Sequence, residues 1–467
     1  MVVEAATAGS GSPVTVGAGA GNIAVHSYRL STVVPGSVTG EAVDYELTDA
    51  DLLHKLHYLR AVHVFRAPAP GDAAAAFTVR ELKEPMFPWL DMYFPISGRL
   101  RRHQVATDGE EVAAAGRPYV RCNDCGVRVV EAACDATVDE WLEQEAERGG
   151  MSQALAYDKV IGPELFFSPL LYVQVTSFKC GGMSLGFTWA HLIGDIPSAA
   201  ACFSTWAQLF SSKKPPAPTL RDPLTVPPQP AAPATVTAPP SVKATATPVG
   251  DYWVVPTAHN MVPFSFHVTE QHLKGLLQLG HQVGTFELVA ALTWHALATI
   301  RGPEEEVAMR TVTVVKTTDD CPVLPATSGG GARLGLTNEH RIGHVVATGS
   351  SPSDVATLAA LLAKVSLDEA GAVAAAVLAG AEEAGVVVYG ANLTFVDAEG
   401  LDVYGGLELG ARRPAHVEYA VDGVGDGGAA VVHRDAGGRG RTVAAVVRRG
   451  EAERLRAALR DALLRVA

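Results

Sequence analysis

The residues best suited to chemistry are His191 and Asp195, in the run His191-Leu-Ile-Gly-Asp195. An imidazole with a pKa near neutral can take a proton from a hydroxyl or an amine as a general base. The chain has 15 histidines, and His191 is the only one with an aspartate four residues later. About one such spacing is expected by chance, so the elements around it must decide its meaning.

A strand is expected to carry His191 to its position. Residues 183–190 alternate apolar with small or polar residues, so the apolar side chains share one face, and His191 follows directly. Residues 171–178 have the same character and predict the other strand of a hairpin. A helix is expected after Asp195, as far as Phe210.

Composition narrows the class of protein. The length of 467 residues indicates two domains or one large two-lobed unit, and 48% hydrophobic with 19% charged residues is typical of a globular protein. The net charge of −13 argues against a nucleic-acid binder. Six scattered cysteines are too few for a disulfide scaffold, which favours a cytosolic-facing protein. Cys122 and Cys125 have metal-type spacing without a second ligand pair, so no metal site is expected.

The chain is predicted to divide into four segments. Residues 1–22 are rich in Ala, Gly, Ser and Thr, lack the features of a signal peptide, and are expected to be disordered. Residues 23–212 form an N-terminal lobe, residues 213–260 a Pro- and Ala-rich crossover linker, and residues 261–467 a C-terminal lobe. The sequence contains no stretch of about 20 apolar residues, so no membrane span is predicted.

Both lobes mix strands and helices, which predicts an α/β (mixed α+β) fold. Residues 119–122 and 127–130 are expected to pair as a hairpin. His340 and His344 are spaced four apart, but no Glu follows His340 as a zinc-protease motif requires, so both are assigned to a loop.

Five runs, in order along the chain, resemble motifs of the plant BAHD acyltransferases, which transfer acyl groups from acyl-CoA to alcohols and amines. His191–Asp195 falls in that family's H-x-x-x-D slot. The other four are Leu47-Thr-Asp-Ala-Asp51, Tyr93-Phe-Pro-Ile-Ser-Gly-Arg-Leu100, Arg121 to Ala132, and Thr285-Phe-Glu-Leu-Val-Ala-Ala-Leu-Thr-Trp294.

The resemblance implies two chloramphenicol-acetyltransferase-like lobes with a tunnel at their interface, entered by acyl-CoA from one side and the acceptor from the other. His191 would be the catalytic base. Asp195 would support the motif by pairing with a basic residue, and Lys316 stands about where the family has one. No bound cofactor is implied, because acyl-CoA is the co-substrate.

The second family motif, D-F-G-W-G, is degenerate here. Asp402-Val-Tyr-Gly-Gly406 matches it only at Asp402 and Gly406, which are assigned a supporting role, and Gly405 replaces the aromatic residue. Loss of one donor to a developing oxyanion costs about 3–4 kcal/mol of transition-state stabilisation.

This degenerate run, with the sequence around His191, resembles the Eceriferum/Glossy cuticular-wax clade. That clade supports elongation of very-long-chain fatty acids with the condensing enzyme of the elongase, on the cytoplasmic face of the endoplasmic reticulum. Two hypotheses follow. In one, a monomeric protein in the cytosol or at that membrane uses His191 to form an ester or amide. In the other, the fold binds acyl-CoA or a long acyl chain and modifies the condensing enzyme.

Overall fold

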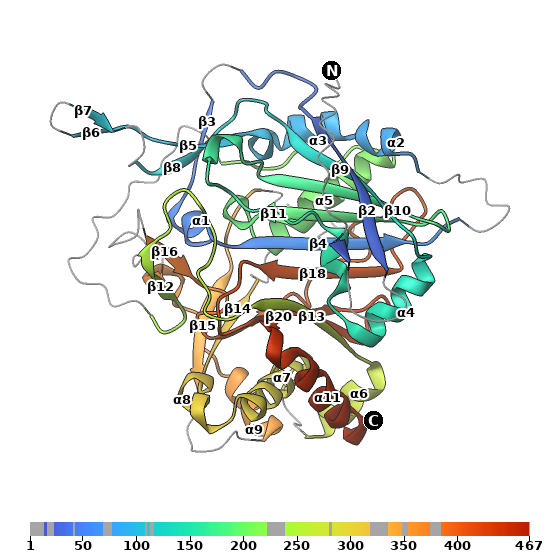
Figure 1. Cartoon of the computed structure of the whole chain (residues 1–467), viewed down its shortest axis with the longest axis vertical. Helices are drawn as coiled ribbons and strands as arrows, with labels where there is room; N and C mark the ends of the chain where they lie inside the picture. Colours follow the sequence, from blue (N-terminus) through green and yellow to red (C-terminus); the bar gives the residue numbers. More distant parts are fainter. Residues whose placement is uncertain are drawn as a thin grey trace.

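The protein is described by a computed structural model that covers residues 14–15, 23–40, 43–68, 77–107, 110–112, 116–221, 239–279, 283–317, 335–347, 354–373 and 384–466. Within these ranges two large mixed sheets lie next to each other, and helices pack against each sheet (Figure 1). This is the two-lobed α/β arrangement that the sequence predicts.

The first sheet carries the histidine loop. In spatial order its strands are β1 (Val14–Thr15), β2 (Ala24–Val33), β9 (Val127–Cys134), β10 (Leu171–Phe178), β11 (Met183–Ala190), β4 (Tyr58–Phe65) and β18 (His416–Asp422). The predicted hairpin is β10 and β11, and all eight residues of β11 are buried. A strand that is covered on both faces delivers the residue after it, His191, to the interior of the molecule.

The strand β18 comes from the second half of the chain but belongs to the first sheet. It pairs antiparallel with β4, from His416 opposite Val64 to Asp422 opposite Tyr58. The linker predicted at 213–260 therefore does not separate the sheets cleanly, because the chain returns to the first sheet after that linker.

The second sheet forms the core of the other lobe. In spatial order its strands are β13 (Met261–Val268), β20 (Arg441–Arg448), β19 (Ala429–Arg434), β17 (Leu393–Asp397), β14 (Thr311–Lys316) and β15 (Arg341–Val346). The helices packed with it are α6 (Glu270–Leu279), α7 (Thr285–Arg301), α8 (Glu306–Met309), α9 (Val355–Leu362) and α11 (Arg449–Val466), with η5 (Pro303–Glu305). Leu455, Leu459 and Leu463 of α11 share the buried face that the helical spacing predicts.

The first half adds short helices around its sheet. They are α1 (Asp49–Leu53), α2 (Val79–Lys83), α3 (Met86–Met92), α4 (Val138–Arg148) and α5 (Ile196–Phe210), with η1 (Phe94–Ser97), η2 (Met151–Leu155), η3 (Leu165–Phe167) and η4 (His191–Ile193). Thr48, Thr78 and Thr137 each begin a helix with a capping box, in which the threonine and an acid three residues later satisfy each other's backbone N–H groups.

Three small sheets are also found among the described residues, and they correct one expectation. Their strands are β3 (Asp44–Glu46), β8 (Pro118–Arg121) and β5 (Arg99–Arg102); β6 (Val105–Thr107) and β7 (Glu110–Val112); and β12 (Lys243–Pro248) with β16 (Ala384–Val387). The predicted hairpin of β8 with β9 is wrong, because β8 pairs with β3 and β5 whereas β9 pairs with β2 and β10. The strand β12 lies within the residues predicted as the crossover linker.

The N-terminal segment also differs from expectation where it is described. Val14–Thr15 pairs with Ala24 and Val25 of β2, although disorder was predicted for residues 1–22. The rest of that segment lies outside the described residues.

Candidate active site

The loop that follows β11 is fixed by its own backbone and by Trp189. His191 opens the short helix η4, and its N–H donates to the carbonyl of His57 at 3.1 Å. The indole N–H of Trp189 donates to the carbonyl of Gly194 at 2.9 Å. Gly194 has φ +158°, and a Cβ at this position would lie 2.8 Å from Cβ of Ser198. The turn at Gly194 therefore needs glycine.

The His191 ring is completely enclosed. Its residue is 0% exposed, and Nε2 lies 2.8 Å from the hydroxyl oxygen of Tyr389, a residue that follows β16. The ring of His54 stacks on it at 4.2 Å with 16° between the planes. The predicted catalytic residue thus sits where elements of both halves meet, but no part of it faces solvent in this structure.

The second nitrogen of the ring, Nδ1, is buried and makes no well-aligned hydrogen bond among the described residues. The backbone of His191 itself and the side chain of Asn338 nevertheless lie close enough to the ring to raise its pKa, partly offsetting burial. In a working general base the second nitrogen normally donates to an acceptor, which keeps the lone pair on the nitrogen that faces the substrate. The tautomer decides whether Nε2 accepts from the hydroxyl of Tyr389 or donates to it.

Electrostatics keep this region neutral. Burial lowers the pKa of His191 well below its usual value, and His340 and His57 lower it further. Burial raises the pKa of the Tyr389 hydroxyl, and nearby Asp195 adds to that rise. A neutral ring can accept a proton, but a strongly lowered pKa makes it a weak base at neutral pH.

Three further histidines surround His191, and the four are called the histidine cluster: His54, His57, His191 and His340. Nε2 of His54 lies 2.8 Å from Nε2 of His340, so one ring donates to the other. His340, assigned to a loop from the sequence, does lie in a loop, whereas His344 lies in β15. Within the described ranges no three His, Cys, Asp or Glu side chains converge as a metal site, because these rings stack and pair instead.

His57 connects the residue that follows β11 with the residue that follows β16. Nε2 of His57 accepts from the backbone N–H of Val388 at 3.0 Å, and Nδ1 lies 2.8 Å from the carbonyl of Gly423. Because Nε2 accepts, Nδ1 must carry the proton and donate to Gly423. Burial lowers the pKa of His57 to about 4, consistent with this fixed neutral tautomer. The side chain of His57 thus fixes Val388, the residue before Tyr389. The backbone carbonyl of His57 fixes His191.

Asp195 does not pair with a basic residue, contrary to expectation. Its carboxylate accepts from the N–H of Ser198 at 3.1 Å, which caps α5, and from the N–H of Glu339 at 3.1 Å. No Lys or Arg in the described part of the chain forms an ion pair with it. Burial raises its pKa to about 6, and the two backbone N–H groups only partly offset this.

Lys316, the basic residue considered for Asp195, pairs elsewhere. Its Nζ lies 2.8 Å from Glu287 and 3.5 Å from Asp397, both within the second lobe. The pairing with Asp195 is therefore wrong, because β14 ends in a local cluster of acids on α7 and β17.

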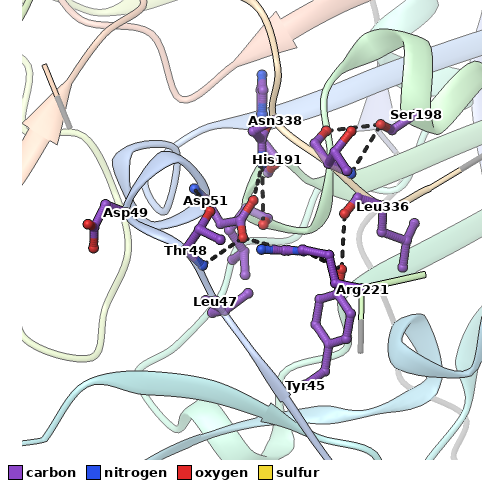
Figure 2. Close-up of polar contacts among 12 residues, drawn as sticks. Tyr45, Leu47, Thr48, Asp49, Asp51, His191, Ser198, Arg221, Leu336 and Asn338 are labelled. Carbon is purple, nitrogen blue, oxygen red and sulfur yellow. Dashed lines mark hydrogen bonds and ion pairs between the residues drawn. The ribbon is translucent and has the colours of Figure 1, made fainter. Parts of the chain in front are cut away.

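A network around Asp51 holds the segment 336–339 against the histidine loop (Figure 2). The buried carboxylate of Asp51 accepts from Asn338 Nδ2 at 3.0 Å and from Arg221 at 2.7 Å. Asn338 Nδ2 also donates to the carbonyl of His191 at 3.1 Å. The hydroxyl of Tyr45 donates to the carbonyl of Leu336 at 3.0 Å. Asp51, noted only as part of a family motif, is thus a structural support of the loop.

Asp402 does not have the supporting contacts that the resemblance implied. Asp402 is exposed and accepts from the N–H of Gly405 at 2.8 Å, as a turn carboxylate does, while the N–H of Gly406 donates to the carbonyl of Asp402. Glu399 instead forms an ion pair with the buried Arg441 and accepts from Thr285 Oγ1 at 2.8 Å. The supporting acid is Glu399, which joins β17, β20 and α7.

One cavity among the described residues lies beside the histidine cluster. It has a volume of about 290 Å³ and is lined by residues that include Tyr58 and Gly423. Another, of about 640 Å³, lies between α4, β13 and α11, with Glu145, Arg456 and Leu463 in its lining. His191 does not line either of these two cavities. No helix within the described ranges is both long and apolar enough to cross a membrane.

Two mixed-sheet lobes, with a histidine loop at the end of a buried strand where they meet, define the two-lobed fold of the chloramphenicol acetyltransferase type. The fold matches the crystal structure of vinorine synthase with a TM-score of 0.63 and 18% identity, covering 95% of this chain and 98% of that one. It also matches TRI101 of F. graminearum, solved with coenzyme A and T-2 mycotoxin, with a TM-score of 0.62 and 14% identity over 89% and 97% of the two chains.

The model of the Transferase family matches residues 23–448. The chain therefore belongs to this family, the BAHD acyltransferases, which confirms the resemblance found in the sequence. It is 35% identical to Protein ECERIFERUM 26-like of Arabidopsis thaliana, over 87% of this chain and 89% of the relative. It is also 35% identical to Protein ECERIFERUM 26 of the same plant, over 94% and 96%.

Sequence reasoning missed several residues of the site. His54 and His57 follow a capped helix with a short spacing that could have drawn attention, whereas His340 was noticed only as half of a rejected zinc pattern. Nothing in the local sequence around Tyr389 indicates that it meets His191, because the two lie 198 residues apart.

Proposed function

We propose that this protein acts in the elongation of very-long-chain fatty acids for cuticular wax. The observation that carries the proposal is its likeness, over most of its length, to ECERIFERUM proteins. By that resemblance it acts on the cytoplasmic face of the endoplasmic reticulum or in the cytosol, as a monomer, with the condensing enzyme of the elongase as partner. Its ligand is acyl-CoA or a long acyl chain.

The surroundings of His191 support an accessory role over turnover. A general base needs access to its substrate, and the His191 ring is completely buried. Asp195 stabilises the loop by accepting hydrogen bonds from backbone N–H groups, and this structural role does not depend on catalysis. A protein that acts by binding a partner enzyme can therefore retain the loop.

Replacing His191 by Ala in a wax-deficient mutant plant tests this role. We expect the variant to restore wax chain length as fully as the wild-type protein, measured by gas chromatography of surface wax. His103→Ala is the matched control, because His103 is a partly exposed histidine remote from the cluster. Failure of His191→Ala to rescue, with normal protein amounts and normal rescue by the control, would return base catalysis to the cellular role.

One observation favours a second candidate, conventional acyl transfer from acyl-CoA to an alcohol or amine. Nε2 of His191 already lies at hydrogen-bond distance from a hydroxyl, that of Tyr389. This candidate predicts that the purified protein releases CoA from acyl-CoA when an acceptor is added, and that His191→Ala abolishes the release. No release across a panel of acyl chain lengths and acceptors would contradict it.

A further inference from the structure

Tyr389 occupies the position that a substrate hydroxyl would need. Its hydroxyl oxygen lies 2.8 Å from Nε2 of His191, which is the distance of an acceptor hydroxyl poised for deprotonation. The tyrosine is 1% exposed, and its ring lies 5.4 Å from that of His191 and 4.9 Å from that of His57. An acceptor and the tyrosine cannot occupy this position together.

The backbone around Tyr389 is fixed on both sides. The N–H of Val388 donates to His57, and the carbonyl of Tyr389 accepts from the N–H of Gly425 at 2.9 Å. Gly390 has φ +86°, and a Cβ there would lie 2.4 Å from the backbone nitrogen of Gly425. Because the chain cannot swing away as a segment, only a change of side-chain rotamer can move the hydroxyl.

One cavity among the described residues approaches this pair from the side of His57. The cavity of about 290 Å³ is lined by Gly423, whose carbonyl accepts from His57 Nδ1. The ring of His57 in turn packs edge-on against that of Tyr389, with 79° between the planes. A molecule in this cavity is therefore separated from His191 by the rings of His57 and Tyr389.

We propose that Tyr389 masks His191, and that its side chain must turn away before any hydroxyl or amine can reach Nε2. Tyr389 is thus a positioning residue that controls access to the imidazole. This inference deepens the conventional acyl-transfer candidate, since it names the step that limits it. It does not depend on the wax role, because it concerns only the exposure of one ring nitrogen.

The test is the reactivity of His191 toward diethyl pyrocarbonate in the full-length protein. The reagent modifies accessible neutral imidazoles, and mass spectrometry of the peptide that contains His191 gives the rate. In the wild-type protein we expect a rate at least about tenfold below that of partly exposed His103. Tyr389→Ala should raise the His191 rate about tenfold, and Tyr389→Phe, which removes one hydrogen bond and keeps the ring, should raise it only a few-fold.

Tyr419→Phe is the matched control, because Tyr419 is a buried tyrosine on β18 whose ring contacts His63 rather than the histidine cluster. It should leave the His191 rate unchanged. Circular dichroism and thermal unfolding establish that each variant is folded, and Tyr389→Phe keeps the test valid if Tyr389→Ala does not fold. A wild-type rate equal to that of His103 would overturn the proposal. Equal rates in the wild type and in the folded Tyr389 variants would overturn it as well.

A second measurement separates this proposal from the functional ones. CoA release from acyl-CoA in the presence of an alcohol should be faster for Tyr389→Ala than for wild type, and the gain should vanish in the double variant with His191→Ala. Unmasking without CoA release supports Tyr389 as the mask and counts only against acyl transfer. Faster CoA release that persists without His191 would overturn the proposed link between Tyr389 and the imidazole.

Discussion

His191 keeps the residue type of a general base but lacks the surroundings that make one. Its Nε2 faces a protein hydroxyl, and its ring is enclosed. Asp195 likewise keeps its place in the motif while its carboxylate binds two backbone N–H groups instead of a cation. At this scale the chemistry of the residues is set by what they contact, and here those contacts are structural.

The raised pKa of Asp195 gives a pH-dependent contribution to stability. Its pKa is about 6 in the folded protein and near 3.8 when unfolded, so the folded state holds the proton more tightly. The stabilisation is complete below about pH 4 and is lost as pH rises through about 6. We expect the free energy of unfolding of wild type, relative to Asp195→Asn, to fall by about 1–3 kcal/mol between pH 4.5 and pH 7 in urea titrations.

Asp354 provides the control for this experiment. It caps α9 by accepting from the N–H of Thr357, but it is exposed, and those hydrogen bonds lower its pKa. Asp354→Asn should therefore not reproduce the fall in stability toward neutral pH. A difference between wild type and Asp195→Asn that stays constant with pH would show that Asp195 does not titrate in this range.

At the scale of elements, the site is held by contacts between segments far apart in sequence. The capped helix α1 supplies Asp51, which holds Asn338 against the carbonyl of His191. His57, just after α1, fixes the end of β11 and the end of β16 together. The strands bring the residues close, and these side chains set the final positions.

Glu399 and Asp402 make a matched pair for testing which acid supports the second lobe. Glu399→Gln breaks an ion pair with the buried Arg441 and should lower the free energy of unfolding by about 2–4 kcal/mol. Asp402→Asn should change it by less than about 0.5 kcal/mol, because the exposed turn accepts asparagine equally well. Denaturant titration of both variants measures the difference. A larger loss for Asp402→Asn would place the supporting acid at Asp402 after all.

At the scale of the molecule, the two lobes share one sheet. Because β18 from the second half completes the first sheet, its contacts with β4 cross the lobe boundary. Arg60 of β4 reinforces them, since its buried guanidinium pairs with Asp422 of β18 at 2.5 Å and with Asp158 at 2.6 Å. These links hold the lobes close, and the histidine cluster lies at the same end of β4 as Asp422.

The sequence by itself determined the family, the mixed sheets and the hairpin that carries His191. These features depend on alternation, helical spacing and motif residues within a few positions of one another, and such patterns are local. It failed where a partner lies far away, as for the hairpin wrongly assigned to β8 and β9 and for the acid misplaced at Asp402. Only the tertiary structure decided that the imidazole is enclosed. Its contacts with Tyr389 and the bond between His57 and Val388 join residues 198 and 331 positions apart, and only the packing of the two lobes brings them together.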